Sequence, residues 1–396
     1  MENIKVNIVL EVLKLKRKLV SIFLIFAMIT LPMSVFGEID ITSKAALLMD
    51  YSTGKIIYAL NEHEKLPPAS VTKIMTLLLS MEAIHDGKIK MDDKVVISEY
   101  AAGMGGTQVY LEPGETQRIE DLIRAVIIRS ANDAAVALGE AISGSNEAFV
   151  KLMNDRAKSL GMENTHFSNA SGLPTEDHYT TAYDIALMSR ELLKYDELQK
   201  YLTSYMEDIL VGKNKDDTQV MVNTNRLIRD YEGTTGIKTG STNVAGYCIS
   251  ASAKRDNLHL IAVILGGATG QIRFNEAKKL LDYGFANYES YSIGKKDDVI
   301  ATLPVEKSDV TSVDSVLERD VNALLPKGNK GEVKKEIVNS DIIQSPIQKG
   351  DKLGELIISI NGEEIDRVNL VAKNDVKSAG FFLILKRTIS SYISGT

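Results

Sequence analysis

The sequence predicts an α/β domain, in which an antiparallel sheet is flanked by helices, followed by a small all-β domain. Two apolar, strand-like runs lie near the start of the chain, at residues 45–49 and 56–60. Two more, at residues 247–253 and 258–265, are joined by Arg255-Asp256-Asn257 and indicate a β-hairpin. The segment between the two pairs is mostly helical in its apolar periodicity. Terminal strands that meet in one sheet, with these helices packed on it, give an α/β sandwich.

The chain of 396 residues changes character near its last quarter. Residues 38–290 are long enough for one substantial domain. Beyond them, short alternating runs are separated by turn signals, and Asn361-Gly362 between two such runs strongly indicates a hairpin. We therefore expect residues 297–372 to form a small β-rich domain.

The first chemical motif is Ser70-Val71-Thr72-Lys73. Pro67 and Pro68 end any earlier helix, and the apolar run at 74–84 predicts a buried helix with Ser70 in its first turn. Free N–H groups and the positive dipole end favour an oxyanion there. Residues three apart share a helix face, so the Lys73 amine can lie beside the Ser70 hydroxyl.

The S-x-x-K spacing alone is a weak signal, because it arises easily by chance. Ser70 could equally be a helix N-cap that precedes an ordinary surface lysine. A second copy, Ser292-Ile293-Gly294-Lys295, runs into Lys296-Asp297-Asp298 with no apolar helix behind it. We therefore expect a turn at the second copy.

The second motif is Ser130-Ala131-Asn132. It interrupts an apolar helical run at residues 119–127, and the helical pattern resumes at 134–142. A polar break inside a helical hairpin can project Ser130 and Asn132 into a cleft. The alternative is that they cap the next helix.

The third motif, Lys238-Thr239-Gly240, leads into the predicted hairpin at residues 247–265. We expect Lys238 on the first strand of that hairpin, facing an anionic ligand group. Burial of Lys73, with Lys238 as a second cation, would lower the Lys73 pKa and let that lysine act as a base. The alternative is a solvated lysine on an edge strand. The three motifs together, in this order and context, indicate a serine acyl-transfer site.

The motifs resemble those of the low-molecular-weight penicillin-binding proteins, which are serine-type D-alanyl-D-alanine carboxypeptidases. The likeness covers nearly the whole mature chain, and the fold it implies is the serine β-lactamase and penicillin-binding-protein type. Further segments that resemble the family are residues 45–50, Gly54-Lys55, Pro68-Ala69-Ser70, residues 165–173, residues 180–184, and Gly266-Gly267 followed by Arg273.

The resemblance implies that Ser70 is the nucleophile and that Lys73 takes its proton. Ser130 and Lys238 would relay protons and orient the substrate, while Asn132 would hydrogen-bond the peptide backbone. Ser70 would attack the carbonyl of the penultimate D-alanine of a peptidoglycan stem peptide. Free D-alanine would leave, and water would hydrolyse the acyl-enzyme. Penicillin and other β-lactams would acylate the same serine, and no cofactor is implied.

The resemblance also implies a substrate-binding segment. The backbone N–H groups of Ser70 and Ser241 would form an oxyanion hole. Thr239, next to Gly240 and helped by Arg273, would hold the terminal carboxylate of the substrate.

Two other functions share these features. A class A β-lactamase needs a Glu that drives deacylation, normally in a Glu-x-x-Leu-Asn segment between the second and third motifs. Residues 131–237 contain no Glu-x-x-Leu-Asn segment. The appended C-terminal region also argues against a β-lactamase. A non-catalytic cell-wall scaffold would keep the fold without the chemistry, although all five polar catalytic residues are present.

Other chemistries find little support. The five histidines form no H-E-x-x-H or comparable pair, so no metal is expected. No Gly-rich phosphate loop follows a strand, and a net charge of −7 without a basic patch disfavours nucleic acid. Cys248 is the only cysteine, which excludes a disulfide within the chain.

The two ends of the chain predict export and membrane association. A basic stretch at residues 14–18 and an apolar run at 19–33 indicate a signal peptide over residues 1–37, or alternatively a retained anchor. Residues 378–396 are amphipathic and too short to span a bilayer, so we expect a helix in the membrane interface. The alternative is a terminal helix packed on the β-rich domain. With either a cleaved signal peptide or a retained N-terminal anchor, the catalytic part would lie outside the cytoplasm, peripheral to the membrane or secreted.

Overall fold

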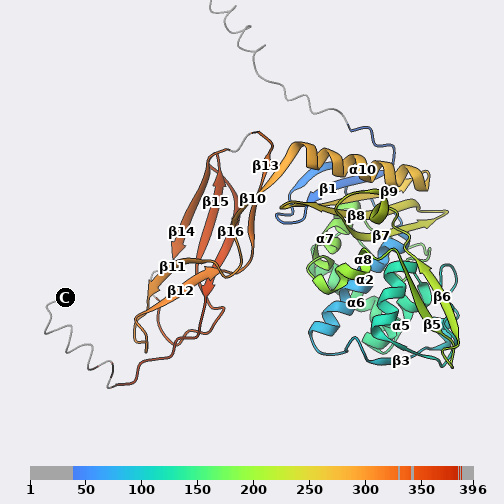
Figure 1. Cartoon of the computed structure of the whole chain (residues 1–396), viewed down its shortest axis with the longest axis horizontal. Helices are drawn as coiled ribbons and strands as arrows, with labels where there is room; N and C mark the ends of the chain where they lie inside the picture. The colour runs from blue at the N-terminus through green and yellow to red at the C-terminus, as the bar shows by residue number, and fades with distance from the viewer. Residues whose placement is uncertain (1–38, 329–330, 340–342, 382, 384, 386–396) are drawn as a thin grey trace, which may run out of the picture. The chain divides into compact units, whose positions relative to one another are not determined.

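The computed structural model describes residues 39–328, 331–339, 343–381, 383 and 385. The predicted signal peptide at residues 1–37 lies outside this range. Within residues 41–396, which form one compact unit by their contacts, the helices and strands make an α/β domain followed by a β-rich domain (Figure 1).

The α/β domain is built on a five-stranded antiparallel sheet in the order β2-β1-β9-β8-β7. Its strands are β1 (Ala45–Asp50), β2 (Ile56–Leu60), β7 (Thr234–Thr242), β8 (Gly246–Arg255) and β9 (Leu258–Gly267). The first strands of the domain therefore pair with its last ones, as the sequence predicts. β1 is buried along its whole length, so the sheet lies in the interior.

Lys238 lies on β7, a separate strand before the hairpin, so its expected place on the first strand of the hairpin is wrong. The chain turns between Thr242 and Gly246, where Gly246 adopts a φ of +65°. β7 escaped the apolar pattern because its sequence is mainly Thr and Gly. Its backbone pairing with β8 makes it a strand.

Helices cover both faces of this sheet (Figure 1). α10 (Gly270–Asn287) packs on β8 and β9 from one side, and α7 (Ala182–Leu192) packs on β1 and β9 from the other. Beyond α7 lie α2 (Lys73–His85), α5 (Asn132–Ser143) and α6 (Asn146–Ser159), and α4 (Ile119–Arg124) packs on α5. α2 is buried at ten of its thirteen positions, which makes it the central helix of the core.

Shorter elements complete the α/β domain. They are the helices α3 (Glu99–Ala102), α8 (Gln199–Leu202) and α9 (Leu227–Asp230), the pair β3 (Lys94–Val96) and β4 (Thr116–Arg118), and the pair β5 (Met206–Val211) and β6 (Asp217–Val222).

Ser70 lies in a 3₁₀ turn, Ala69–Thr72, that precedes α2, and not in the first turn of the helix as expected. The Lys73 N–H bonds to the carbonyl of Ser70, three residues back, which is the tighter 3₁₀ pattern. Ser70 and Lys73 nevertheless stay one turn apart.

The β-rich domain contains a five-stranded sheet in the order β11-β12-β16-β15-β14. Its strands are β11 (Val299–Pro304), β12 (Ser312–Leu317), β14 (Val333–Asn339), β15 (Lys352–Ile360) and β16 (Glu363–Ala372), beside the pair β10 (Tyr288–Gly294) and β13 (Val321–Pro326). Asn361 and Gly362 form the predicted hairpin turn, with φ values of +52° and +86°. Both the β-rich architecture and this hairpin are confirmed.

The second S-x-x-K copy is only partly a turn. Ser292 lies on β10 and pairs with Asn322 of β13, whereas Lys295 follows the strand. The expectation of a turn is therefore wrong for Ser292, because pairing with β13 extends the backbone there.

Little of the predicted amphipathic segment is described. Ser378 bridges to Ser308, and the Ala379 N–H donates to the Lys307 carbonyl at 2.8 Å, so the segment begins attached to the β-rich domain. None of the helices in the described ranges combines the length and apolar character needed to cross a membrane.

Candidate active site

The structure brings the three motif segments together. β7, which carries Lys238, packs against the 3₁₀ turn of Ser70. The approach is so close that a Cβ on Gly240 would lie 2.8 Å from the Ser70 nitrogen and 2.9 Å from that of Val71. Glycine is therefore required in the third motif, because any side chain there would displace the serine turn.

The amine of Lys73 connects the first two motifs. Lys73 is completely buried, and its Nζ lies 3.0 Å from the Ser70 Oγ. The same Nζ donates to the Asn132 Oδ1 at 2.6 Å and to the Ser171 carbonyl at 2.7 Å. Three oxygen atoms thus hold the amine in place. The alternative of an ordinary surface lysine is excluded.

Burial is also the main electrostatic influence on Lys73. It lowers the pKa of this amine well below the usual lysine value, and the nearby charge of Lys238 lowers it further. The negative charge of Asp133 opposes the shift, but its carboxylate accepts hydrogen bonds from the N–H groups of Val109 and Leu111 and none from the amine. A larger fraction of the Lys73 amine is therefore neutral near pH 7 than in an exposed lysine.

The backbone around the second motif is unusual. A π-helical turn, Ala125–Arg129, ends at Ser130, which adopts the left-handed conformation with φ +67°. α5 begins at Asn132, whose Nδ2 donates to the Gly105 carbonyl at 2.6 Å. π-turns and left-handed non-glycine residues concentrate at functional sites, where surrounding contacts hold them. Both motif side chains are buried, and Asn132 faces Lys73.

Lys238 is also completely buried, so the alternative of a solvated edge lysine is wrong. Its Nζ donates to the Thr239 carbonyl at 3.2 Å. Burial, and then the charge of Arg273, lower the pKa of Lys238 to about 7. This amine can therefore gain or lose a proton near neutral pH.

Arg273 and Thr239 lie at the same segment of β7. Arg273 donates from Nη1 to the carbonyls of Gly240 at 2.9 Å and Cys248 at 3.3 Å, while its buried Nε has no protein partner. Burial lowers the pKa of Arg273 to about 10. Thr239 is buried, and Ser241 is exposed at the end of the strand. The chemistry of this region is cationic and rich in donors, which suits an anionic group.

Sequence reasoning missed several groups that support these residues. The Ser171 carbonyl accepts from Lys73, and Thr224 Oγ1 accepts a hydrogen bond of 2.7 Å from Thr239 Oγ1. The buried His178 accepts at Nδ1 from the Ser168 N–H, so its Nε2 is left to donate to the Thr72 Oγ1, 2.7 Å away.

A local signal existed for Ser171. Asn169-Ala170-Ser171-Gly172 has an Asn that can accept from the backbone two residues on, as in an Asx-turn, and the structure has this turn. Thr224 and His178 carry no such signal, since their partners Thr239, Ser168 and Thr72 lie 15, 10 and 106 residues away in the chain, beyond any local turn.

No three His, Cys, Asp or Glu side chains within the described ranges are grouped as a metal site would require.

The fold and this arrangement of Ser70, Lys73, Asn132 and Lys238 define the penicillin-binding-protein and β-lactamase class of α/β domain. The sequence profile of the D-alanyl-D-alanine carboxypeptidases, peptidase family S11, matches residues 32–269. The profile of the C-terminal domain of penicillin-binding protein 5 matches residues 288–378. The chain belongs to the S11 family of D-alanyl-D-alanine carboxypeptidases, the low-molecular-weight penicillin-binding proteins.

Relatives match over most of their length. The chain is 43% identical to the D-alanyl-D-alanine carboxypeptidase DacF of Bacillus subtilis, over 96% of this chain and 99% of that protein. It is 32% identical to the D-alanyl-D-alanine carboxypeptidase DacA of Escherichia coli, over 87% of this chain and 86% of that protein. Penicillin-binding protein 5 of Haemophilus influenzae superposes with a TM-score of 0.70 at 34% identity, over 86% of this chain and 98% of that structure. The predicted fold class and carboxypeptidase activity are confirmed.

Proposed function

We propose that Ser70 is the nucleophile of this carboxypeptidase and that neutral Lys73 is the base that activates it. The observation that carries this proposal is the position of the buried Lys73 amine, 3.0 Å from the Ser70 Oγ. A buried amine of lowered pKa can accept the serine proton at neutral pH, and the serine oxygen can then attack a carbonyl carbon. Asn132 and the Ser171 carbonyl orient the amine toward the serine.

Ser130 and Lys238 return a proton to the leaving amine of D-alanine. The pKa of about 7 for Lys238 supports a relay at neutral pH. The N–H groups of Ser70 and Ser241 stabilise the oxyanion of the tetrahedral intermediate. Thr239, assisted by Arg273, binds the terminal carboxylate.

The substrate is a peptidoglycan stem peptide that ends in D-Ala-D-Ala, and β-lactams acylate the same serine. A relative of 30% identity, penicillin-binding protein D2 of Listeria monocytogenes, has been crystallised in an ampicillin-bound form, with a TM-score of 0.56 over 63% of this chain and 99% of that structure. We further propose an exported enzyme at the outer face of the bacterial cytoplasmic membrane, with residues 1–37 as signal peptide and residues 378–396 as interfacial helix. Membership of the family supports export.

The test is mass spectrometry of the penicillin adduct, mapped to one serine. We expect the adduct on Ser70, and we expect Ser70→Ala to lose both the adduct and the release of D-alanine from a D-Ala-D-Ala peptide. Ser292→Ala is the matched control, because it changes the serine of the second S-x-x-K copy and should retain both.

Each alternative predicts a different result. An adduct on any residue other than Ser70 would overturn the mechanism. Rapid turnover of penicillin without D-alanine release would indicate a β-lactamase, and a chain that takes no label and releases no D-alanine would be a scaffold.

A further inference from the structure

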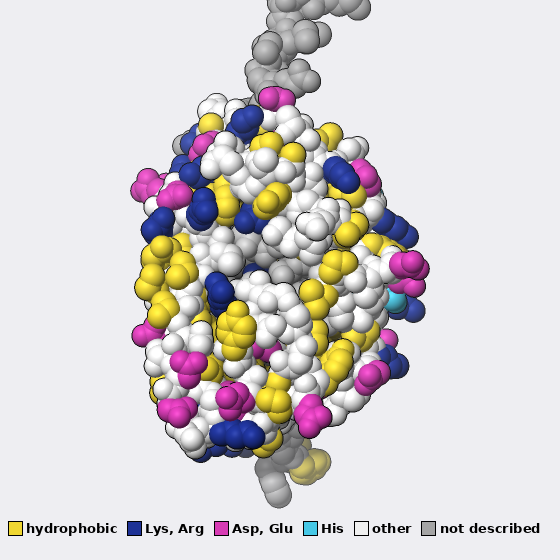
Figure 2. Space-filling view, turned by 90° about the vertical axis from the view of Figure 1, so that its right-hand side faces the viewer, with side chains coloured by type: hydrophobic (Ala, Val, Ile, Leu, Met, Phe, Trp, Pro, Cys, Tyr) yellow, Lys and Arg dark blue, Asp and Glu magenta, His cyan; other side chains and the backbone are white. Residues whose placement is uncertain are grey.

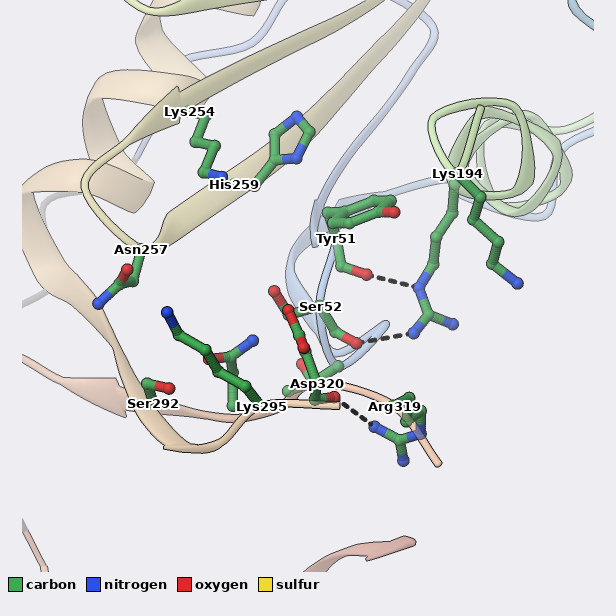
Figure 3. A pocket seen from close by; sticks show the side chains of 13 residues that line it. Tyr51, Ser52, Lys194, Lys254, Asn257, His259, Ser292, Lys295, Arg319 and Asp320 are labelled. Atoms are coloured by element: carbon green, nitrogen blue, oxygen red, sulfur yellow. Dashed lines mark hydrogen bonds between the residues drawn. The ribbon is translucent and has the colours of Figure 1, made fainter. Parts of the chain in front are cut away.

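A polar pocket lies outside the active site, at the end of the central sheet where the β1–β2 and β8–β9 turns are found. It encloses about 750 Å³. Figure 3 shows Lys254 and Asn257 at the β8–β9 turn, Tyr51 at the end of β1, and Lys295 after β10, around the open middle of the view. Arg319, just before β13, closes the pocket on another side.

The pocket is strongly cationic. Five of its lining side chains are Lys or Arg, and one, Asp320, is acidic. The whole chain has a net charge of −7, so the positive charge of this lining is opposite in sign to the net charge of the protein. Elsewhere, on the face shown in Figure 2, charged side chains of both signs are interspersed.

Two of the five cations are already compensated. Arg319 pairs with Asp366 at 2.6 Å, and Lys194 pairs with Glu191 at 2.6 Å. Among the described residues, Arg190, Lys254 and Lys295 form no ion pair with a carboxylate.

Arg190 is held rigidly in the wall of the pocket. Its Nε donates to the Tyr51 carbonyl at 2.6 Å and its Nη2 to the Ser52 carbonyl at 2.8 Å, the two bonds dashed at the labelled Tyr51 and Ser52 in Figure 3. These bonds fix the guanidinium without neutralising its charge, and the buried Asp50 carboxyl interacts with it only electrostatically, with no ion pair between them. Lys254 and Lys295 are exposed, and each ammonium has three donors on a flexible stem.

We infer that this pocket binds an anion that carries several phosphate or phosphodiester groups. Three cations on separate elements, none of them in an ion pair among the described residues, attract an anion with two or three charges, whereas a single carboxylate would leave two of them unpaired. Asn257, Asn322 and Ser292 add uncharged donors to the lining. The volume is larger than one phosphate needs, so a short chain of phosphates fits.

The pocket is separate from the catalytic residues. β7, β8 and β9 are consecutive antiparallel strands, so the β7–β8 turn and the β8–β9 turn lie at opposite ends of the sheet. Ser241 lies beside the first turn and Lys254 beside the second. Binding at the pocket therefore needs none of the groups that act on the peptide, and an enzyme held there on a polyanion keeps its active site free.

The second S-x-x-K copy contributes to this site. Ser292 and Lys295 both line the pocket, although Lys295 follows a strand and has no helical turn that would aim it at Ser292. Lys295 thus supplies a charge and Ser292 a hydroxyl donor to the pocket, and Ser292 does not act as a nucleophile.

The test is isothermal titration of the whole exported chain with inorganic tripolyphosphate, at about 0.05 M and about 0.15 M NaCl. We expect saturable binding that weakens at the higher salt concentration. The double variant Lys254→Ala/Lys295→Ala should bind at least about tenfold more weakly. Asp320→Asn should bind more tightly, because it removes the one negative charge from the lining. Lys158→Ala, which changes an exposed lysine of α6, should bind as the wild type does.

Penicillin acylation of each variant is measured in parallel. It should be unchanged, which shows that the variants are folded and separates this test from that of the active site. A second titration, with a poly(glycerol phosphate) chain, distinguishes the source of the phosphate. Binding of both probes indicates a phosphodiester polymer, and binding of tripolyphosphate alone indicates free oligophosphate. Absence of saturable binding to either probe, or a double variant that binds as the wild type does, overturns the inference.

Discussion

Lys73 has three hydrogen-bond acceptors around its amine and no carboxylate among them. A buried ammonium is costly without a counter-charge, so the environment favours the neutral amine. The acceptors come from Ser70, Asn132 and Ser171, and they keep the amine oriented whether or not it is protonated. The site therefore favours the neutral form of the Lys73 amine, which can act as a base, over a buried ammonium.

The pH dependence of acylation follows from this environment. The neutral amine is the reactive form, so the rate constant for penicillin acylation should rise with pH as Lys73 loses its proton. Because the pKa of Lys73 is lowered, the rise should level off well below 10.5, the value of an ordinary lysine. Stopped-flow acylation between acid and alkaline pH measures this profile.

Lys73→Arg keeps a cation but removes the base, since a guanidinium is not deprotonated in this range. We expect acylation to fall by about 10²- to 10⁴-fold, the usual contribution of a general base. Lys158→Arg on the surface of α6 is the control and should have no effect. An arginine variant that acylates at the wild-type rate with the same pH profile would exclude Lys73 as the base.

At the scale of elements, the loop at residues 169–173 carries the Ser171 carbonyl to the amine. The Asn169 Oδ1 accepts from the N–H groups of Ser171 and Gly172, at 3.1 and 2.7 Å. Gly172 has a φ of +82°, and a Cβ there would lie 1.9 Å from the Ala69 carbonyl oxygen. The loop and the serine turn are thus in direct backbone contact, and only glycine permits it.

Gly172→Ala should therefore damage both stability and chemistry. We expect the free energy of unfolding to fall by more than about 3 kcal/mol, from the positive φ and the steric overlap together. The acylation rate of the folded fraction should fall as well, because the serine turn must move. Urea denaturation and penicillin labelling measure the two effects.

Gly144→Ala is the matched control for Gly172→Ala. Gly144 has a similar φ of +79°, but no atom lies within 4 Å of the position that an added Cβ would occupy. We expect a loss of only about 1 kcal/mol, from backbone conformation alone, and normal acylation. Equal losses in the two variants would show that the contact between the loop and the serine turn carries no energy.

At the scale of the whole molecule, the β-rich domain ends in a strand and then a short bridged segment. Ser378 and Ala379 are tied to residues 307–308 by backbone bonds. A deletion that tests membrane attachment should therefore begin at residue 381, so that these bonds remain.

We expect the chain without residues 381–396 to leave the membrane fraction once the signal peptide has been removed. The physical reason is the loss of an apolar helix face that would lie in the interface. Fractionation of cells followed by penicillin labelling measures the distribution, and the undeleted chain is the control. A deleted protein that stays in the membrane fraction would contradict the anchor and favour a helix packed on the β-rich domain.

The sequence predicts those parts of the fold that a short stretch of residues specifies, such as a turn between two apolar runs. The β8–β9 hairpin follows from two apolar runs around a polar turn, and the β15–β16 hairpin from Asn361-Gly362. β7 has no apolar pattern, and its register follows from pairing with β8 and from close packing on the serine turn. Neither contact is visible in the local sequence. The apolar pattern at residues 74–84 likewise predicts an α-helical first turn at Ser70, because it contains no signal for the packing of β7 on the 3₁₀ turn Ala69–Thr72.

The amino-acid sequence alone establishes which chemical groups are available: a serine with a lysine one turn later, a Ser-x-Asn break between helices, and a Lys-Thr-Gly segment. The resemblance of these motifs to those of the low-molecular-weight penicillin-binding proteins also indicates the family, and the sequence profile confirms it. The tertiary structure decided what those groups can do. Asn132 and Ser171, which are 59 and 98 residues from Lys73 in the chain, meet its amine only in the fold. The lowered pKa values of Lys73 and Lys238 depend on burial and on charges brought near from other elements, and both are properties of the folded molecule.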